Sequence, residues 1–272
     1  KERWRTPVAP NPGALAVAGD ALLVGSMQTG ELEQLSLADG LVHGSAEPGP
    51  GTPIFGGGTA AFSAQVMNGS AVRAIAVAPK AGRALLATIG PNVGPNALRM
   101  EVSMNGGVTV AGLSPLEVKH HLGFGAGVTQ ALAVDEAKGL VFAADVSLGL
   151  VRVLDLKKLL SADPSQALLQ ELAVPPPADF PRIRPESDLG VKGRAGVSLH
   201  SGPAALWLAG ERLVVLDRFT GTVAVVDVRG ATKKKAALVT QWPLAKMLTQ
   251  PTRRLGEVLY FETWVSTLHG GR

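Results

Sequence analysis

A stretch of about two dozen residues occurs twice in this chain, and the two copies align without a gap. Ala14–Leu37 reads ALAVAGDALLVGSMQTGELEQLSL, and Ala205–Val228 reads ALWLAGERLVVLDRFTGTVAVVDV. A third copy, Ala131–Leu156, is slightly longer, and a weaker fourth copy begins near Ala74. Because one repeat unit buries its faces only against its neighbours, such a repeat constrains the fold more than any single motif does.

The repeated unit has the composition of β-strands. Short runs of Val, Leu and Ala are separated by Gly, Asp, Asn and Pro, which is typical of strands joined by turns. Gly221 lies at a hairpin position where a positive φ is tolerated, and Gly30 and Gly149 take the same place in their copies. A helical interpretation is disfavoured by the repeated glycines. Helical character is expected only in Asp155–Leu169, where Pro164 limits it to short turns.

The spacing of the copies predicts an all-β chain folded as a β-propeller. Repeats begin near residues 14, 74, 131 and 205, and this spacing exceeds the roughly 40–45 residues of a minimal four-stranded blade. Gly/Pro-rich loops take up the surplus, at residues 47–59, 90–96 and 173–196. A β-sandwich with chance self-similarity is the alternative. Seven blades would need degenerate blades within residues 41–72 and 95–125, or strands from beyond this chain.

Composition excludes several kinds of site. The chain has no cysteine, so it holds no disulfide, thiolate metal site or covalently attached haem. No apolar run is long enough to span a bilayer, and no signal peptide is visible in the given sequence. The cluster Lys233–Lys235 is interpreted as an exposed hairpin tip. Aromatic residues are only 4% and do not interleave with basic ones, so nucleic-acid binding is not expected.

Polar candidates within the repeats have mostly structural interpretations. His120 and His121 are adjacent, so on a strand they point to opposite faces and cannot chelate one metal together; axial ligation of a haem by one of them is the alternative. Four aspartates recur at repeat-equivalent positions and are expected to cap turns, with a cation-binding ring in a central channel as the alternative. They are Asp145, Asp155, Asp217 and Asp227. Trp207 and Trp242 are expected in the core or at a blade edge. No catalytic residue and no metal site is predicted.

The repeats resemble the YVTN-type propeller repeats of bacterial surface-layer and exported proteins, which are WD40-like in their blades. In that family a line of the form Ala-Val-Asp, Gly, Val-Tyr-Val-Ala-Asn, then Val-Ser-Val-Ile-Asp recurs. The best matches here are residues 133–135, 141–145, 151–155, 213–217 and 223–227. The resemblance implies a propeller with a periplasmic or extracellular location in a bacterium.

The chain departs from this repeat after Trp242. Pro251–Ser266 reads PTRRLGEVLYFETWVS, in which apolar residues are spaced for a short C-terminal helix. This segment resembles the beginning of the first haem domain of bacterial di-haem cytochrome c peroxidases and their MauG-like relatives. Seven residues fit that pattern: Arg254, Gly256, Leu259, Tyr260, Phe261, Glu262 and Ser266. Trp264 and Val265 replace the usual Arg-Leu pair.

This second resemblance implies a division of the chain and a function. Residues 1–245 would form the propeller, and residues 246–272 a linker and the beginning of a cytochrome c domain, cut before its Cys-x-x-Cys-His motif. Haem c is expected on the downstream segment, with His269, Trp264 and Arg254 near the haem site.

The propeller would then serve docking or substrate recognition for electron transfer in an exported di-haem c-type cytochrome. Its partners would be the cytochrome domain, on the same or an associated polypeptide, and a redox protein. Peroxidase-like chemistry would belong to the haem domain. A stand-alone exported propeller that binds a cell-surface polymer or a protein is the alternative. A propeller enzyme with a channel metal is disfavoured, because no His/Glu/Asp cluster converges in the sequence.

Overall fold

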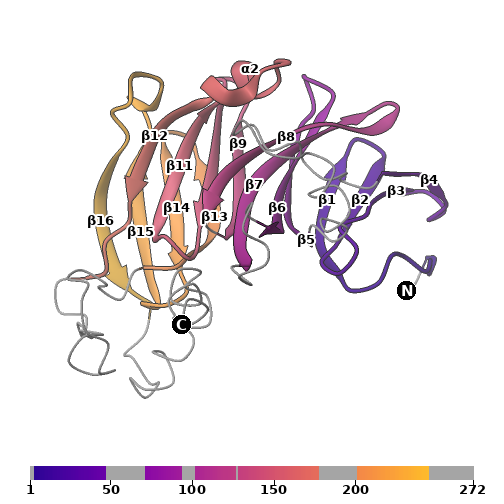
Figure 1. Ribbon diagram of the computed structural model, residues 1–272, viewed down its shortest axis with the longest axis horizontal. Coiled ribbons are helices and arrows are strands. Elements are labelled where there is room, and N and C mark those ends of the chain that lie inside the picture. Colours follow the sequence, from indigo (N-terminus) through magenta and orange to yellow (C-terminus); the bar gives the residue numbers. More distant parts are fainter. Residues whose placement is uncertain (1–2, 47–70, 94–101, 127, 178–200, 245–272) are drawn as a thin grey trace.

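The computed structural model describes residues 3–46, 71–93, 102–126, 128–177 and 201–244. These residues form four antiparallel sheets of four strands each, which we call blades 1 to 4 in chain order (Figure 1). Within each blade the strand order follows the chain, so every blade is an up-and-down meander. The prediction of an all-β chain is confirmed, and four separate sheets disfavour a two-sheet sandwich.

The strands have the following bounds. Blade 1 consists of β1 (Pro12–Ala18), β2 (Ala21–Ser26), β3 (Leu32–Ser36) and β4 (Val42–Ala46). Blade 2 consists of β5 (Ala71–Ala78), β6 (Arg83–Val93), β7 (Val102–Leu113) and β8 (Leu116–Ala126). Blade 3 consists of β9 (Thr129–Asp135), β10 (Leu140–Asp145), β11 (Leu150–Asp155) and β12 (Leu168–Ala173). Blade 4 consists of β13 (Pro203–Ala209), β14 (Arg212–Asp217), β15 (Thr222–Asp227) and β16 (Ala237–Pro243).

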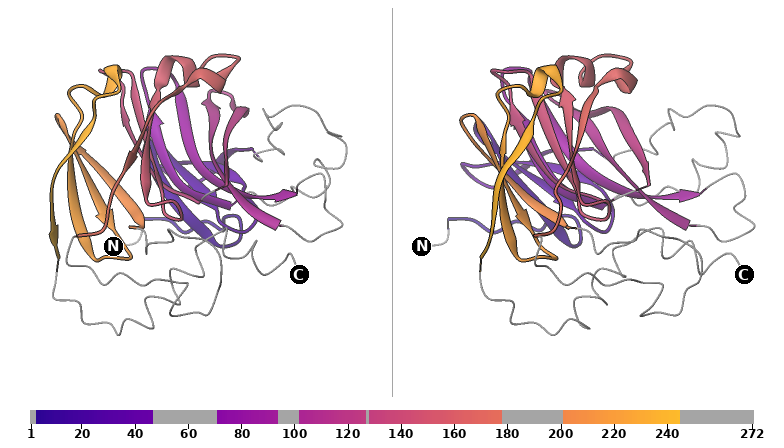
Figure 2. Two further views of the ribbon diagram at one scale, coloured as in Figure 1. Left: turned by 60° about the vertical axis from the view of Figure 1, so that its left-hand side comes forward. Right: turned by 90° about the vertical axis from the view of Figure 1, so that its left-hand side faces the viewer.

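Consecutive blades meet through their first strands. β1 contacts β5, β5 contacts β9, and β9 contacts β13. Blades 4 and 1 therefore lie at opposite ends of a row, as Figure 1 shows, and the views of Figure 2 show the sheets splaying from one another. Radially arranged meanders that meet in this way define a β-propeller-like fold.

Helical structure in the described residues is short. α2 (Leu156–Leu159) and the 3₁₀ turn η2 (Pro164–Gln166) join β11 to β12, as expected from the sequence. A second 3₁₀ turn, η3 (Ala231–Lys233), lies between β15 and β16. No helix in the described ranges is long and apolar enough to cross a membrane. The predicted C-terminal helix lies outside the described residues.

Glycine allows the tight turns that join the second and third strands. Gly30, Gly149 and Gly221 have φ values of 75°, 65° and 63°, which the sequence analysis anticipated. Residues with a Cβ rarely adopt this conformation, so these glycines terminate one strand and begin the next without strain. The same short hairpin therefore recurs in blades 1, 3 and 4.

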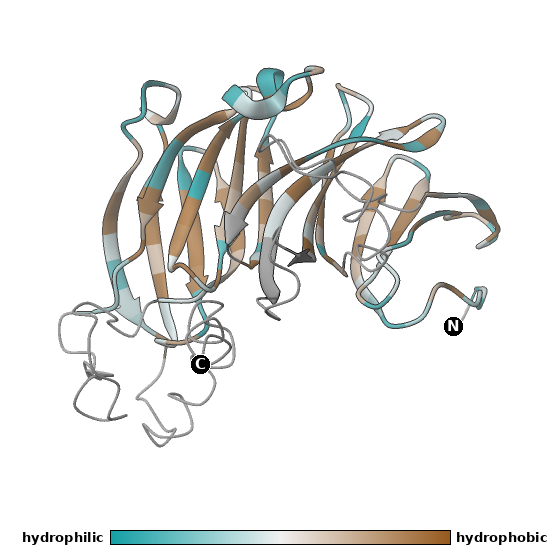
Figure 3. Ribbon diagram, in the orientation of Figure 1, coloured by the Kyte–Doolittle hydropathy of each residue, from teal (hydrophilic) through white to brown (hydrophobic). Residues whose placement is uncertain are grey.

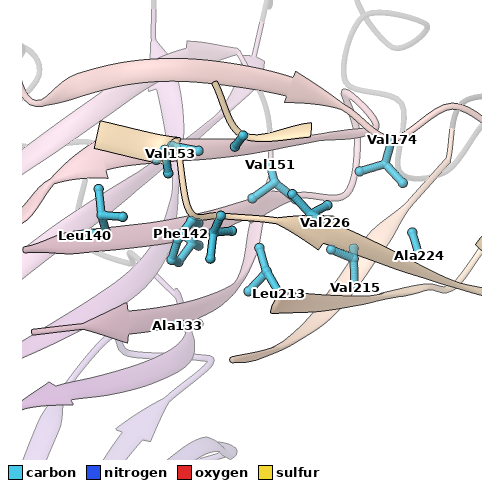
Figure 4. Packing of buried hydrophobic residues seen from close by; sticks show 13 residues of the cluster. Ala133, Leu140, Phe142, Val151, Val153, Val174, Leu213, Val215, Ala224 and Val226 are labelled. Carbon is cyan, nitrogen blue, oxygen red and sulfur yellow. The ribbon is translucent and has the colours of Figure 1, made fainter. Parts of the chain in front are cut away.

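The core is divided into three hydrophobic clusters, and each lies between two consecutive blades. The cluster between blades 3 and 4 contains Phe142, Val153, Leu213 and Val226, all essentially inaccessible to solvent (Figure 4). The others join blades 2 and 3 and blades 1 and 2. In Figure 3 the strands are predominantly hydrophobic and the connecting turns hydrophilic. Burial between blades thus holds the repeats together.

The structure shows where residues 102–126 belong. Residues 95–125 were expected to hold a degenerate blade of their own if the wheel had seven blades. Instead β7 and β8 pair with β6 in the sheet that begins at β5, so residues 102–126 complete blade 2. Likewise β4 completes blade 1. The described residues therefore form four blades.

Candidate functional site

The first strand of each blade has two different sides. Large apolar residues at two alternate positions face the preceding blade, and small residues between them face the following blade. Ile75 and Val77 pack between blades 1 and 2, and Leu132 and Val134 pack between blades 2 and 3. Ala14 and the other small residues receive these side chains from the next blade. This alternation has the two-residue period that the sequence predicted. The structure adds which side of the strand faces the preceding blade and which faces the following one.

The two ends of the row expose opposite sides of this strand. On β1, Leu15 and Val17 are 65% and 60% exposed, while the alanines between and beside them are covered. On β13 the pattern is reversed: Trp207 is 68% exposed, and its alternate neighbours Ala205 and Ala209 are exposed too. No residue of the inner strands β5 and β9 is exposed. The end strands lack a neighbour on one side within the described residues.

Strand register extends the exposed side of β13 across the whole of blade 4. Trp207 lies opposite Val214, which lies opposite Val225. In the adjacent row Leu216 lies opposite Val223, which lies opposite Trp242. We call this surface the blade 4 end face; it consists of Trp207, Val214, Leu216, Val223, Val225 and Trp242. Two tryptophans are exposed within this apolar surface, and the exposed apolar patches of monomeric proteins are usually small.

The opposite surface is smaller. We call Leu15, Val17 and Leu22 the blade 1 end face, since Val17 lies opposite Leu22. The N-terminal segment covers the outer part of this blade, where the Ala9 amide donates to Glu33 Oε2 at 2.8 Å and the Trp4 indole donates to the Leu37 carbonyl. That segment leaves β1 uncovered, and Leu15 and Val17 remain exposed there. At the outer edge of the blade Leu41 and Val42 are exposed as well.

A polar residue at the end of each second strand ties the turn to the chain that enters the blade. In blade 3, Asp145 Oδ1 accepts the amides of Ser147, Leu148 and Val128. In blade 4, Asp217 Oδ1 accepts the amides of Thr220 and Gly202. The turn-capping role predicted for these aspartates is confirmed.

The other two repeated aspartates also cap local structure. Asp155 accepts from the Lys158 amide at the start of α2, and Asp227 accepts from the Arg229 amide. The adjacent Arg229 holds the pKa of Asp227 well below its usual range by hydrogen bonding. Among the described residues there is no group of three or more His, Asp or Glu side chains placed to hold a metal ion.

The second oxygens of Asp145 and Asp217 differ. Asp145 Oδ2 forms a buried ion pair with Arg152 Nη1 at 2.6 Å, and the guanidinium lies 4.4 Å from the Phe124 ring centroid of blade 2. In the gapped repeat alignment, Ala224 takes the place of Arg152 in blade 4. Asp217 Oδ2 is buried and has no hydrogen-bond partner. The inner blade thus pairs its second carboxylate oxygen with a cation, whereas the second oxygen of Asp217 has no hydrogen-bond partner.

The histidine pair is divided between two sides of β8, as expected for adjacent strand residues. His120 Nε2 donates to the Leu159 carbonyl of α2 at 2.6 Å. His121 Nδ1 forms a hydrogen bond with Thr109 Oγ1 at 2.9 Å, and burial lowers the pKa of His121 to about 4. His121 is therefore neutral at pH 7, and the two rings cannot bind one ligand together.

The remaining predicted residues are placed as follows. Lys233–Lys235 lie exposed in the connection between β15 and β16, which confirms the hairpin tip. His269, Trp264 and Arg254 lie outside the described residues, as does the whole segment 246–272. Trp207 and Trp242 are exposed and lie on β13 and β16, the two edge strands of blade 4, so of the two predicted places the blade edge is the one observed. The sequence signal that could have found this face is Trp207 itself, which stands where the other copies have alanine.

Comparison with solved structures supports the propeller-like fold. The periplasmic gluconolactonase PpgL of Pseudomonas aeruginosa is similar with a TM-score of 0.54 and 16% identity, over 88% of this chain and 58% of that one. A functionally unknown protein from Desulfotomaculum acetoxidans DSM 771 is similar with a TM-score of 0.51 and 11% identity, over 86% of this chain and 56% of that one. This chain therefore spans little more than half the length of either structure.

A third structure, the computationally designed Ika4 protein, has a TM-score of 0.47 and 16% identity, over 84% of this chain and 98% of that one. No protein-family model matches the chain, and no curated protein matches it. At these identities the likenesses show the fold alone.

Proposed function

We propose that this chain is the protein-docking propeller of an exported electron-transfer protein that carries c-type haem on another segment. The observation that carries the docking role is the pair of end faces, where large apolar side chains remain exposed. Monomeric proteins keep such patches small, and exposed tryptophans are the side chains on which protein interfaces most often depend.

The cytochrome part of the proposal is supported by the resemblance of residues 251–266 and by where they attach. β16 is the outermost strand of blade 4 and ends at Pro243. The cytochrome-like segment follows it directly in the sequence. The haem domain would therefore follow blade 4 in the chain.

This chain does not itself fit a covalent haem. Thioether attachment of haem c needs two cysteine thiols, and the chain has none. The electron transfer, and any peroxide chemistry, would belong to the attached or associated haem domain. The propeller would contribute binding surface and would position the redox partner protein.

A periplasmic or extracellular location completes the proposal. The resemblance to YVTN-type propellers of exported proteins supports it, and one structural neighbour is described as periplasmic. The second candidate function is a stand-alone exported propeller that binds a protein. The end faces favour it, since they lie within this chain and need no haem domain.

Two observations on the natural gene product test the proposal. A Cys-x-x-Cys-His motif within about a dozen codons after residue 272, together with a haem Soret band in the purified protein, is the expected result. A stop codon at that point and a colourless protein with no bound cytochrome would overturn the cytochrome part. The stand-alone binding module would then be the remaining function.

A further inference from the structure

We propose that two copies of this chain close one eight-bladed wheel, in which the blade 1 end face of each copy docks on the blade 4 end face of the other. The inference rests on the proposed docking role of the end faces and names their occupant. It is independent of any cytochrome domain.

The blade 1 end face duplicates a surface that already docks within the chain. In the gapless self-match, Leu15 corresponds to Leu206 and Val17 to Leu208. Leu206 and Leu208 pack into the cluster between blades 3 and 4. The first strand of blade 1 therefore carries the same inserting residues as that of blade 4. The counterparts of Val215 and Val226, Val24 and Leu35, are already buried, on the blade whose outer part the N-terminal segment covers. Within the described residues no blade precedes this strand.

The blade 4 end face is the matching receiving side. Val214 and Val223 correspond to Leu23 and Leu32 of blade 1, which are fully buried against blade 2. In blade 4 both valines remain partly exposed. The blade 4 end face therefore has the strand geometry that receives a following blade. No blade packs on it within the described residues.

One copy does not bring its own ends together. β1 and β13 are not among the strand pairs in substantial contact, and Figure 1 shows blades 1 and 4 at opposite ends of the row. Two copies related by a two-fold axis satisfy both faces at once, because each supplies one inserting and one receiving side. Four blades from each copy give eight, which is within the range of known propellers.

The proposed interface between copies differs from the interfaces within a copy at one position, which Trp207 occupies in blade 4. Ala16 and Ala133 occupy the corresponding position in blades 1 and 3; Ala133 packs in the cluster with blade 4, and alternation puts Ala16 on the same side of β1. The indole of Trp207 projects much further and would lie between Leu15 and Val17 of the second copy. A tryptophan surrounded by apolar neighbours is a strong anchor for an interface, so shortening it is expected to weaken association.

Sedimentation velocity on the full 272-residue chain tests the inference. The wild type is expected to sediment at twice its 28.0 kDa mass. Leu15→Asp and Trp207→Asp should each weaken self-association at least tenfold. Leu168→Asp is the matched control, because Leu168 is an exposed apolar residue of β12 outside both end faces and should leave the dimer intact.

Mixing the two variants gives the decisive result. A Leu15→Asp copy retains its blade 4 end face, and a Trp207→Asp copy retains its blade 1 end face. The mixture therefore keeps one intact interface and is expected to form a dimer that neither variant forms alone. Circular dichroism verifies folding, and Leu15→Ser and Trp207→Ser replace any variant that unfolds.

Three outcomes would overturn the closed wheel. They are a folded wild-type monomer at all concentrations, a dimer indifferent to both substitutions, and a mixture that stays monomeric. None of them bears on the haem motif and Soret test, so failure of the wheel and failure of the cytochrome proposal are distinguishable.

Discussion

β9 of the inner blade 3 and β13 of the end blade 4 have the same alternation of residues and different surroundings. Both sides of β9 are covered, whereas β13 is covered only on the side that faces blade 3. Exposure here is decided by the presence of a neighbouring blade and not by the strand's own pattern. The repeat therefore encodes an interface with two sides, and within the described residues an end blade uses only one of them.

The buried aspartates of the inner and end blades also differ in their partners. Asp145 in blade 3 is neutralised by Arg152, which reaches across to Phe124 of blade 2. Asp217 in blade 4 retains a buried oxygen without a hydrogen-bond partner. Substitutions at matched positions of the inner and end blades test this comparison.

The largest expected effect is at the inner aspartate. Arg152→Ala leaves the Asp145 carboxylate buried without its cation, which should lower the free energy of unfolding by about 3–5 kcal/mol. Asp217→Asn keeps the Oδ1 acceptor and replaces an oxygen that has no hydrogen-bond partner, so it should change that free energy by no more than about 1 kcal/mol. Urea titration measures both. Equal destabilisation by the two substitutions would show that the blades do not differ in this way.

A pH titration of stability compares a partly buried histidine of blade 2, His121, with an exposed one of blade 1, His43. His121 has a folded-state pKa of about 4, below its unfolded value, so its contribution is full above about pH 6.5 and is lost as pH falls towards 4. The stability difference between pH 7 and pH 4 should include on the order of 3 kcal/mol from this residue.

The control for this titration is in the same chain. His121→Asn should remove that part of the pH dependence, and His43→Gln, at an exposed position of β4, should leave it unchanged. A pH profile that is identical in all three proteins would mean that His121 is not buried in its neutral form.

Two adjacent valines of β14 compare the side of blade 4 that faces blade 3 with its open side. Val215 of β14 faces blade 3 and is inaccessible, whereas its neighbour Val214 faces the open side. Val215→Ala should cost about 2 kcal/mol of unfolding free energy, and Val214→Ala less than half of that in the monomer. Thermal unfolding of both variants at equal concentration is the measurement. A larger loss at Val214 would contradict the assignment of the two sides.

The smallest effect is expected at an exposed ion pair of blade 4. Arg229 pairs with Asp227 through both its Nε and a terminal nitrogen, but its side chain lies largely in solvent. Arg229→Gln should leave the melting temperature almost unchanged, since solvent and salt screen such pairs. A loss comparable with that of Arg152→Ala would show that exposure does not separate the two ion pairs.

Much of the fold follows from local sequence, because hairpins depend on neighbouring residues. The strands of blades 1, 3 and 4 and the glycines at 30, 149 and 221 were predicted from alternation and turn chemistry. Blade 2 was only half recognised, since β6 and β7 are long and Gly-rich and do not match the repeat. Their pairing joins segments separated by a loop, which periodicity alone does not reveal.

The candidate site was not predictable in the same way. β1 and β13 have the same apolar alternation as the inner strands, and only the tertiary arrangement decides which of their sides lacks a neighbour. Trp207 was assigned to the core or a blade edge, and the sequence did not show which of the two holds or that its side chain is exposed. The residues proposed near haem, His269, Trp264 and Arg254, stay predictions.

The central claim is that the exposed sides of blades 1 and 4 are two halves of one interface. The chain has no cysteine, so any disulfide that forms must join the two introduced cysteines. Leu15→Cys combined with Ala205→Cys should yield a covalent dimer on a non-reducing gel after mild oxidation. As a positive control for the equivalent inner interface, Ala131→Cys combined with Leu206→Cys should crosslink within one chain. A monomeric Leu15/Ala205 double variant, whether internally bridged or unbridged, would contradict the account.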